Sequence, residues 1–277
     1  MAVRPALRWW VAPVLAAALL SGCSASVQPT SHPGPSPTPV MRRAAPGFLA
    51  AMVDTADPVT TRYGYTIAGS TPSQLPDVAT GQRALVWLGG YNETHCVWNW
   101  SDARIRTEIA MNGLPRSAKV AGYFVADEPN TTGNCPAAAG QVKARSALIR
   151  GADPDRAHFT LVNIDDPAQF GAFRDSADML STDPYPCHVN RSCDWSQIPR
   201  YIAQLRAAGV TRYMGMLQAF SAGDWRWPTA PELERMIAQW QQSDWVGELT
   251  FSWSYDGKRL RDHPDLLGVL RRLNTGE

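Results

Sequence analysis

Eight short apolar runs, spread between residues 48 and 254, constrain the fold of this chain more than any other feature. Each run is six to eight residues long. Runs of this length and character are typical of strands that are buried on both faces of a parallel sheet. The runs are residues 48–53, 63–68, 84–90, 120–126, 158–163, 177–183, 213–220 and 248–254.

Helical patterns separate the later runs. Residues 137–153 and 195–209 are amphipathic, and residues 229–244 open with Thr229 as an N-cap and Pro231 in the first turn. Strands that alternate with helices indicate βαβ units and a parallel sheet. Eight such units predict a small TIM-like (β/α)₈ barrel.

The first half of the chain fits this pattern less well. Nine residues separate the first run from the second, fewer than the dozen or more that a crossover normally needs, and the fifteen between the second and third leave hardly any room for a helix. We therefore expect either a barrel that is trimmed in its first half, or one early strand that is wrongly placed. The alternative fold is an open, doubly wound parallel sheet.

The first 22 residues have the layout of a signal peptide. Arg4 and Arg8 are followed by the apolar run WWVAPVLAAALL and then by Leu-Ser-Gly-Cys, which ends at Cys23. The last four residues resemble a bacterial lipobox, which implies cleavage before Cys23 and a diacylglyceryl group on its thiol. The alternative is an ordinary secreted protein in which Cys23 is incidental. The lipobox predicts a chain anchored by lipid to the outer face of the bacterial cytoplasmic membrane.

A tether follows the signal peptide. Residues 23–46 are rich in Pro, Ser and Thr and poor in large apolar residues, so they cannot bury a core. We expect them to hold the domain away from the membrane. Residues 47–277 suit a single barrel-sized domain.

Charge and motifs exclude several classes of protein. The formal net charge is +1, with both signs scattered along the chain, whereas a nucleic-acid surface needs a clustered basic patch. The sequence contains no phosphate-binding glycine loop, nucleophile elbow or HExxH motif. We therefore expect a monomer that uses no cofactor and binds no nucleic acid.

Four cysteines lie in the predicted domain: Cys96, Cys135, Cys187 and Cys193. Export to an oxidising compartment favours disulfides. Cys187 and Cys193 enclose a short polar loop and form the natural local pair, which leaves Cys96 with Cys135, although three connectivities are open to four cysteines. A zinc site is the weaker alternative because the chain has no CxxC pair, and we expect no metal.

The fourth run, VAGYFVADEPN, ends on two carboxylates. In a (β/α)₈ barrel the active site lies at the carboxyl ends of the strands, which is where Asp127 and Glu128 fall. Pro129 ends the pairing because it has no N–H to donate. Since side chains alternate along a strand, we expect one carboxylate to face the barrel mouth and the other to brace a loop. Capping a turn or pairing with an arginine is the structural alternative.

These strand-end residues give the chain a resemblance to the barrel glycoside hydrolases. Many of those enzymes place an acid/base Glu, commonly followed by Pro, at the end of the fourth strand, and a DEP ending is similar to poorly characterised families among them. The resemblance continues through STDPYP at residues 181–186, MLQAF at 216–220 and FSWSYDG at 251–257. It implies that Glu128 is the general acid.

One position departs from the family pattern. Retaining enzymes with a fourth-strand acid/base carry a nucleophilic Glu at the end of the seventh strand, where this chain has Gln218. Because glycoside hydrolysis usually needs two carboxyl groups, the second must come from elsewhere. Asp183 is the first choice, Asp127 the second and Glu93 the third. Glu248 begins its strand, which places it at the wrong end of the barrel.

The resemblance also implies residues that contact substrate. Asp183 is expected to activate water or to orient a substrate group, and Gln218 and Tyr185 to bind sugar hydroxyls. Trp253, with Trp87 or Tyr91, is expected to offer a flat apolar face to a sugar ring. Further candidates for a substrate wall, or else for packed loop anchors, are Trp225 and Trp227 after the seventh strand and Trp98 and Trp100 after the third. The structural alternatives are that Gln218 satisfies backbone groups and that Trp253 fills the core.

The sequence therefore predicts a lipid-anchored barrel that cleaves or recognises an oligo- or polysaccharide at the cell envelope. The first alternative is a carbohydrate-binding lipoprotein without catalysis, which Gln218 favours. The second is an envelope assembly factor, for which we expect a filled barrel mouth without exposed aromatic residues.

Overall fold

A computed structural model describes residues 44–45, 47–132 and 135–276. The predicted signal peptide, Cys23 and nearly all of the predicted tether lie outside the described residues. No helix in the described part of the chain is long and apolar enough to cross a membrane.

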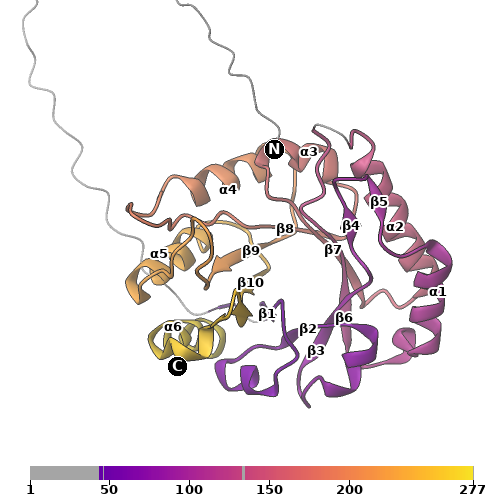
Figure 1. Ribbon diagram of the computed structural model, residues 1–277, viewed down its shortest axis with the longest axis horizontal. Helices are drawn as coiled ribbons and strands as arrows, with labels where there is room; N and C mark the ends of the chain where they lie inside the picture. The colour runs from indigo at the N-terminus through magenta and orange to yellow at the C-terminus, as the bar shows by residue number, and fades with distance from the viewer. Residues whose placement is uncertain (1–43, 46, 133–134, 277) are drawn as a thin grey trace, which may run out of the picture. The chain divides into compact units, whose positions relative to one another are not determined.

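Eight parallel strands close into a barrel (Figure 1). Neighbouring strands follow one another along the chain, and β1 pairs with β10, as in Leu49 with Gly247, to complete the ring. This closure confirms the predicted (β/α)₈ barrel and excludes the open sheet. The strands are β1 (Leu49–Met52), β2 (Ile67–Ser70), β3 (Arg83–Trp87), β6 (Val120–Asp127), β7 (Phe159–Asn163), β8 (Met179–Thr182), β9 (Tyr213–Gln218) and β10 (Gly247–Phe251).

Helices cover the outside of the barrel. Thr229 caps α5 as predicted, because its hydroxyl accepts a hydrogen bond from the Glu232 N–H. The α-helices are α1 (Asp102–Met111), α2 (Ala138–Ala152), α3 (Phe170–Phe173), α4 (Gln197–Ala207), α5 (Ala230–Trp240) and α6 (Pro264–Thr275). The 3₁₀ helices are Pro58–Tyr63, Pro72–Asp77, Leu114–Arg116, Pro167–Gln169 and Leu260–Asp262.

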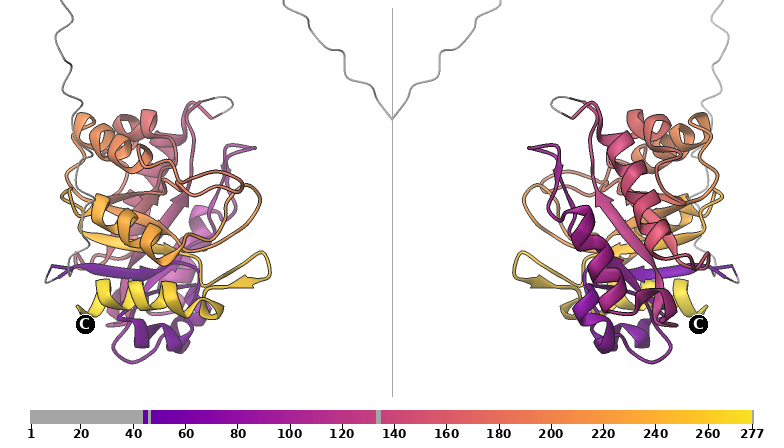
Figure 2. Two further views of the ribbon diagram at one scale, coloured as in Figure 1. Left: turned by 90° about the vertical axis from the view of Figure 1, so that its left-hand side faces the viewer. Right: turned by 90° about the vertical axis from the view of Figure 1, so that its right-hand side faces the viewer.

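Two small hairpins extend from the barrel. They are β4 (Tyr91–Asn92) with β5 (Val97–Trp98), and β11 (Ser254–Tyr255) with β12 (Lys258–Arg259). Figure 2 shows the yellow β11–β12 hairpin and the orange loop after β9 projecting from the same end of the barrel. The segments that follow the strands therefore build one rim, where a barrel of this type carries its site.

The barrel is trimmed in its first half, as one of the two expectations stated. Each of the first two crossovers contains only a 3₁₀ helix. The second strand was nevertheless predicted too early, at residues 63–68, whereas β2 spans Ile67–Ser70. Asp57 accepts a hydrogen bond from the Val59 N–H and Pro58 starts a helical turn, so Tyr63 ends a 3₁₀ helix and the strand begins only at Ile67.

Two apolar cores hold the layers together. Inside the barrel lie side chains such as Leu85, Leu161 and Leu249, while Trp240 belongs to the larger core between strands and helices. Gly215 in β9 lets α5 approach closely, because a Cβ there would lie 2.5 Å from the Trp240 ring. The alternation of inward and outward side chains along each strand supplies both cores.

Both disulfides that the sequence favours are present. Cys96 and Cys135 have Cα atoms 5.3 Å apart, and Cys187 and Cys193 have theirs 4.1 Å apart. The first bond joins the β4–β5 hairpin to the segment before α2, and the second closes the loop after β8. Among the described residues, the one group with metal-ligand spacing is Cys187, Cys193 and Glu232, and its two cysteines are used in the disulfide.

Glu248 is fully buried on the outer side of β10. Its Oε2 accepts a hydrogen bond from the Thr250 hydroxyl at 2.7 Å, and its Oε1 accepts one from Asn274 of α6 at 3.4 Å. The Tyr65 hydroxyl donates to Thr250 in turn. Burial raises the pKa of Glu248 to about 8, so this carboxyl group is protonated at neutral pH and serves the barrel wall.

Glu248 predicts a pH dependence of stability. Because its pKa is raised in the folded state above the ordinary value of 4.5, its contribution is fully present below that value and is lost as pH rises toward 8. We expect the free energy of unfolding to fall over this range, by several kcal/mol at most, and we expect this contribution to the fall to be absent in Glu248→Gln. The free energy of unfolding in urea, measured for both proteins across this pH range, tests the prediction. An equal slope in the variant would contradict the assignment.

Candidate active site

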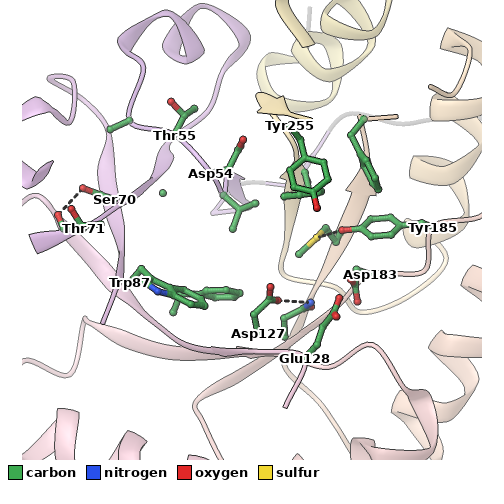
Figure 3. A pocket seen from close by; sticks show the side chains of 18 of the residues that line it. Asp54, Thr55, Ser70, Thr71, Trp87, Asp127, Glu128, Asp183, Tyr185 and Tyr255 are labelled. Atoms are coloured by element: carbon green, nitrogen blue, oxygen red, sulfur yellow. Dashed lines mark hydrogen bonds between the residues drawn. The ribbon is translucent and has the colours of Figure 1, made fainter. Parts of the chain in front are cut away.

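A cavity of about 590 Å³ opens at the carboxyl ends of the strands. Four carboxyl groups line it, from three different strand ends: Asp54, Asp127, Glu128 and Asp183. Its aromatic lining consists of Trp87, Phe124, Tyr185, Phe220, Trp225, Phe251 and Tyr255. Figure 3 shows Asp127, Glu128 and Asp183 together at one edge of the open centre and Asp54 across from them, with Trp87 on one side and Tyr185 and Tyr255 on the other.

The backbone turns sharply at Glu128. This residue follows the end of β6 and has a φ of +46°, in the left-handed region that residues other than glycine rarely adopt. Its N–H donates to the Asn163 carbonyl oxygen at 3.0 Å, which fixes the turn. Both Asp127 and Glu128 line the cavity. The expectation that they would point apart was wrong, because Glu128 lies beyond the strand and strand alternation does not apply to it.

The positive φ at Glu128 indicates a functional site. A residue held in a sparsely populated region costs about 1–3 kcal/mol, and such residues cluster at functional sites. Here the strained residue is also one of the four that bring a carboxyl group into the cavity. The strain at Glu128 places its carboxyl group beside that of Asp183 (Figure 3).

Glu128 and Asp183 form a coupled pair of carboxyl groups. Burial, then the charge of Asp183 and a hydrogen bond to it, raise the pKa of Glu128 far above its ordinary value. Burial also raises the pKa of Asp183, but the hydrogen bond from Glu128 opposes this rise. Like charges this close do not both ionise. Because the pKa of Glu128 is raised more than that of Asp183, we expect the pair to hold one proton at neutral pH, on Glu128.

Asp127 is held by an amide on the neighbouring strand. Asn163 at the end of β7 donates to Asp127 Oδ1 at 3.1 Å, and its own Oδ1 accepts a hydrogen bond from the Ser181 hydroxyl at 3.0 Å. Burial raises the pKa of Asp127. The sequence analysis missed Asn163, although a polar residue at the end of the fifth apolar run was a usable signal.

Asp54 closes the rim between the first and last strands. Its Oδ1 accepts the N–H of Trp253 at 2.9 Å and its Oδ2 accepts that of Ser254 at 3.1 Å. It therefore ties the segment after β1 to the segment after β10. The sequence analysis missed this residue too, although the first apolar run is followed directly by Val53 and Asp54.

Aromatic rings form two walls around the carboxyl groups. The rings of Trp87 and Phe124 lie 4.9 Å apart on one side. The other wall packs edge to face, with 4.9 Å between Tyr185 and Phe220. The outer aromatic residues remain open to solvent: Trp225 is 37% exposed and Tyr255 is 48% exposed. Trp87 and Tyr185 therefore line the cavity as expected, and the mouth is open and aromatic rather than filled.

Gln218 does not line the cavity. It is fully buried, its Oε1 accepts the Cys187 N–H at 2.9 Å, and its Nε2 donates to the carbonyl oxygens of Cys187 and Arg226. All of these partners are backbone groups in the loops after β8 and β9. The expected contact with sugar hydroxyls is therefore wrong, because the amide already holds the two loops together.

Three other candidates also lie away from the cavity lining. Trp253 is 5% exposed, and its indole N–H donates to Asp57 at 3.1 Å. The Tyr91 hydroxyl donates to Gln141 of α2 at 2.5 Å, and Glu93 is not among the lining residues. Position after a strand predicted these residues, but local hydrogen bonds turn the side chains of Trp253 and Tyr91 into the surrounding structure, and Glu93 is exposed in the β4–β5 hairpin.

Comparison with known proteins finds the fold but no family. No protein-family model and no curated protein matches the sequence. A candidate α-L-fucosidase from Bacteroides thetaiotaomicron VPI-5482 has a TM-score of 0.56 at 8% identity, over 92% of this chain and 98% of that one. The β-glucuronidase of Faecalibacterium prausnitzii has a TM-score of 0.55 at 16% identity, over 85% of this chain and 49% of that one.

A third neighbour belongs to the same class of barrel. A structure of fungal β-1,4-galactanases has a TM-score of 0.51 at 9% identity, over 73% of this chain and 89% of that one. The neighbours described here thus carry the names of glycoside hydrolases. At such low identity, the similarity establishes that this chain has their barrel fold.

The role of Gln218 predicts a loss of stability. In Gln218→Leu the backbone groups of Cys187 and Arg226 lose their partners, at about 1–3 kcal/mol for each buried group left unpaired. We expect the free energy of unfolding in urea to fall by at least that amount, while the exposed control Gln204→Leu changes little. Unchanged stability combined with weaker glycan binding would instead make Gln218 a substrate contact.

Proposed function

We propose that this chain is a glycoside hydrolase-like lipoprotein that cleaves an oligo- or polysaccharide at the cell envelope, with Glu128 as the general acid. One observation carries the proposal: a half-buried carboxyl group with a raised pKa, that of Glu128, lies beside the buried Asp183 in an aromatic cavity. A carboxylic acid that keeps its proton near neutral pH is what protonation of a glycosidic oxygen requires. The neighbouring barrels named as glycoside hydrolases are consistent with it.

In this proposal Asp183 acts through Glu128. The two carboxyl groups lie side by side (Figure 3), whereas the two carboxyl groups of a glycosidase flank the scissile bond. We therefore assign the second catalytic carboxyl group to another residue. Asp183 is a positioning residue that keeps the proton on Glu128 and orients its carboxyl group.

Asp127 is the best-placed candidate for the second carboxyl group. It lines the same cavity, and among the described residues a hydrogen bond is found only to its Oδ1. By contrast, both oxygens of Asp54 accept backbone N–H groups. We assign Asp127 the task of activating a water molecule or of orienting a substrate group that performs the displacement.

The aromatic walls fit sugar rings. Pyranose rings present apolar faces that pack on aromatic side chains, and their hydroxyls bind carboxylates and amides. Trp87 and Tyr185 lie on either side of the acidic centre in Figure 3, while Trp225 and Tyr255 are partly open to solvent. We therefore propose that Trp87 and Tyr185 contact the sugar at the acid and that Trp225 and Tyr255 contact sugars further out.

A second candidate function is carbohydrate binding without cleavage. It is favoured by the end of β9, where the amide of Gln218 is bound to backbone groups and supplies no carboxylate. A retaining enzyme with a fourth-strand acid would need its nucleophile there. In the binding protein, the same cavity and aromatic walls would hold a glycan while the Glu128–Asp183 pair supplied hydrogen bonds.

The proposed location is outside the cytoplasm, anchored through lipid on Cys23. Two formed disulfides support an oxidising compartment, and the lipobox resemblance supports the anchor. We expect the chain to fractionate with membranes and to enter the detergent phase on phase separation. Cys23→Ser should move it to the aqueous phase, and an unchanged distribution would rule out this anchor.

The proposed function predicts the effect of removing the acid. The mature chain carrying Cys23→Ser is assayed for reducing-sugar release from envelope and plant polysaccharides. Glu128→Gln should lower the rate about 10²- to 10⁴-fold, the contribution typical of a general acid. Asp175→Asn, an exposed carboxylate paired with Arg174, is the matched control and should leave the rate unchanged.

Two other results would decide against this account. Full activity in Glu128→Gln would mean that the strained residue serves the fold. A folded parent that binds a glycan but hydrolyses none would favour the carbohydrate-binding alternative.

A further inference from the structure

The cavity contains an excess of acidic groups, and this bears on the substrate class under the proposed function. Asp54, Asp127, Glu128 and Asp183 line it, whereas no Lys, Arg or His lines it among the residues that the structure describes. Buried carboxylates in proteins are normally paired with a cation or neutralised by a proton. This cavity offers its carboxyl groups no cation of its own.

One carboxylate oxygen in the cavity is unsatisfied. Asp183 is only 8% exposed, and its Oδ1 has no hydrogen-bond partner in the described part of the chain. A buried acceptor without a partner costs free energy that a donor on a ligand recovers. Asp183 is also the member of the acidic pair that carries the negative charge. A cationic donor is therefore the partner that this oxygen favours most.

The remaining lining groups are consistent with a cationic ligand. Both oxygens of Asp54 and one oxygen of Asp127 accept from protein donors. Among the described residues this leaves the second oxygen of Asp127 and Asp183 Oδ1 for a ligand, and of these two Asp183 Oδ1 is the buried one. Trp87 lines the cavity near the acidic groups (Figure 3). The face of a tryptophan ring attracts a cation within about 6 Å.

We propose that the glycan recognised here is an amino sugar with a free ammonium group, held against Asp183, and that uronic acids and other anionic sugars are excluded. An ammonium group supplies both the missing positive charge and a donor for the free oxygen. A sugar carboxylate would add a further negative charge beside the buried Asp183, in a cavity whose described lining has no cation to receive it. A neutral or N-acetylated sugar would leave the charge of Asp183 unpaired.

Binding, measured apart from cleavage, tests the inference. The mature chain carrying Cys23→Ser and Glu128→Gln is titrated by calorimetry with oligomers of glucosamine and galactosamine, with their N-acetylated counterparts and with oligogalacturonate. We expect a deacetylated oligomer to bind at least about tenfold more tightly than its acetylated counterpart, since charge-assisted hydrogen bonds contribute about 1.5–3 kcal/mol. Oligogalacturonate should bind more weakly than either member of that pair.

Two matched variants test whether Asp183 is responsible for the preference for deacetylated oligomers. Asp183→Asn should abolish the preference for the deacetylated oligomer, while the exposed control Asp175→Asn should keep it. Equal or tighter binding of the acetylated or anionic oligomers, or no binding of either deacetylated series, would overturn the inference. Absence of hydrolysis by the parent, with the preference intact, would instead refute only the catalytic role of Glu128.

Discussion

Closure of the barrel between β1 and β10 is the constraint on which the rest of the structure depends. It requires two glycines next to β1: a Cβ at Gly247 would lie 2.5 Å from the Leu49 carbonyl oxygen, and one at Gly69 would lie 1.8 Å from that of Val53. Only when these strands meet does Asp54 reach the backbone of Trp253. Closure therefore creates the rim as well as the wall, and the ends of all eight strands share one opening.

The acidic centre follows from that rim. Strand ends separated by more than 50 residues in the sequence, at Asp127 and Asp183, come together in a cavity that excludes enough water to raise the pKa of each carboxyl group. The strained turn at Glu128 adds a third group, and the resulting pair shares one proton. The same absence of lining cations among the described residues that favours protonation of Glu128 also favours a ligand with positive charge. The proposed acid catalysis and the proposed specificity would therefore have one electrostatic origin.

The sequence predicted the barrel and the acidic centre better than it predicted the substrate contacts. Apolar runs bounded by polar residues identified all eight strands, apart from the start of β2, where Asp57 and Pro58 begin a helical turn. Strand ends identified three of the four acidic residues of the cavity. Gln218 and Trp253 were placed wrongly, since position after a strand does not reveal which loop will bind a side chain. Asp54 was missed because its partners, Trp253 and Ser254, are distant in sequence.

The proton that Glu128 is proposed to hold beside Asp183 is the central feature of the site, and a direct titration measures the pKa of this carboxyl group. Side-chain carboxyl resonances of isotope-labelled protein are followed by NMR against pH, in the parent and in Asp183→Asn. We expect Glu128 to titrate well above its ordinary pKa of 4.5 in the parent. In the variant its pKa should fall but remain raised, because burial persists while the charge and hydrogen bond of Asp183 are lost. Titration of Glu128 near 4.5 in the parent, or a value unaffected by Asp183→Asn, would contradict the account.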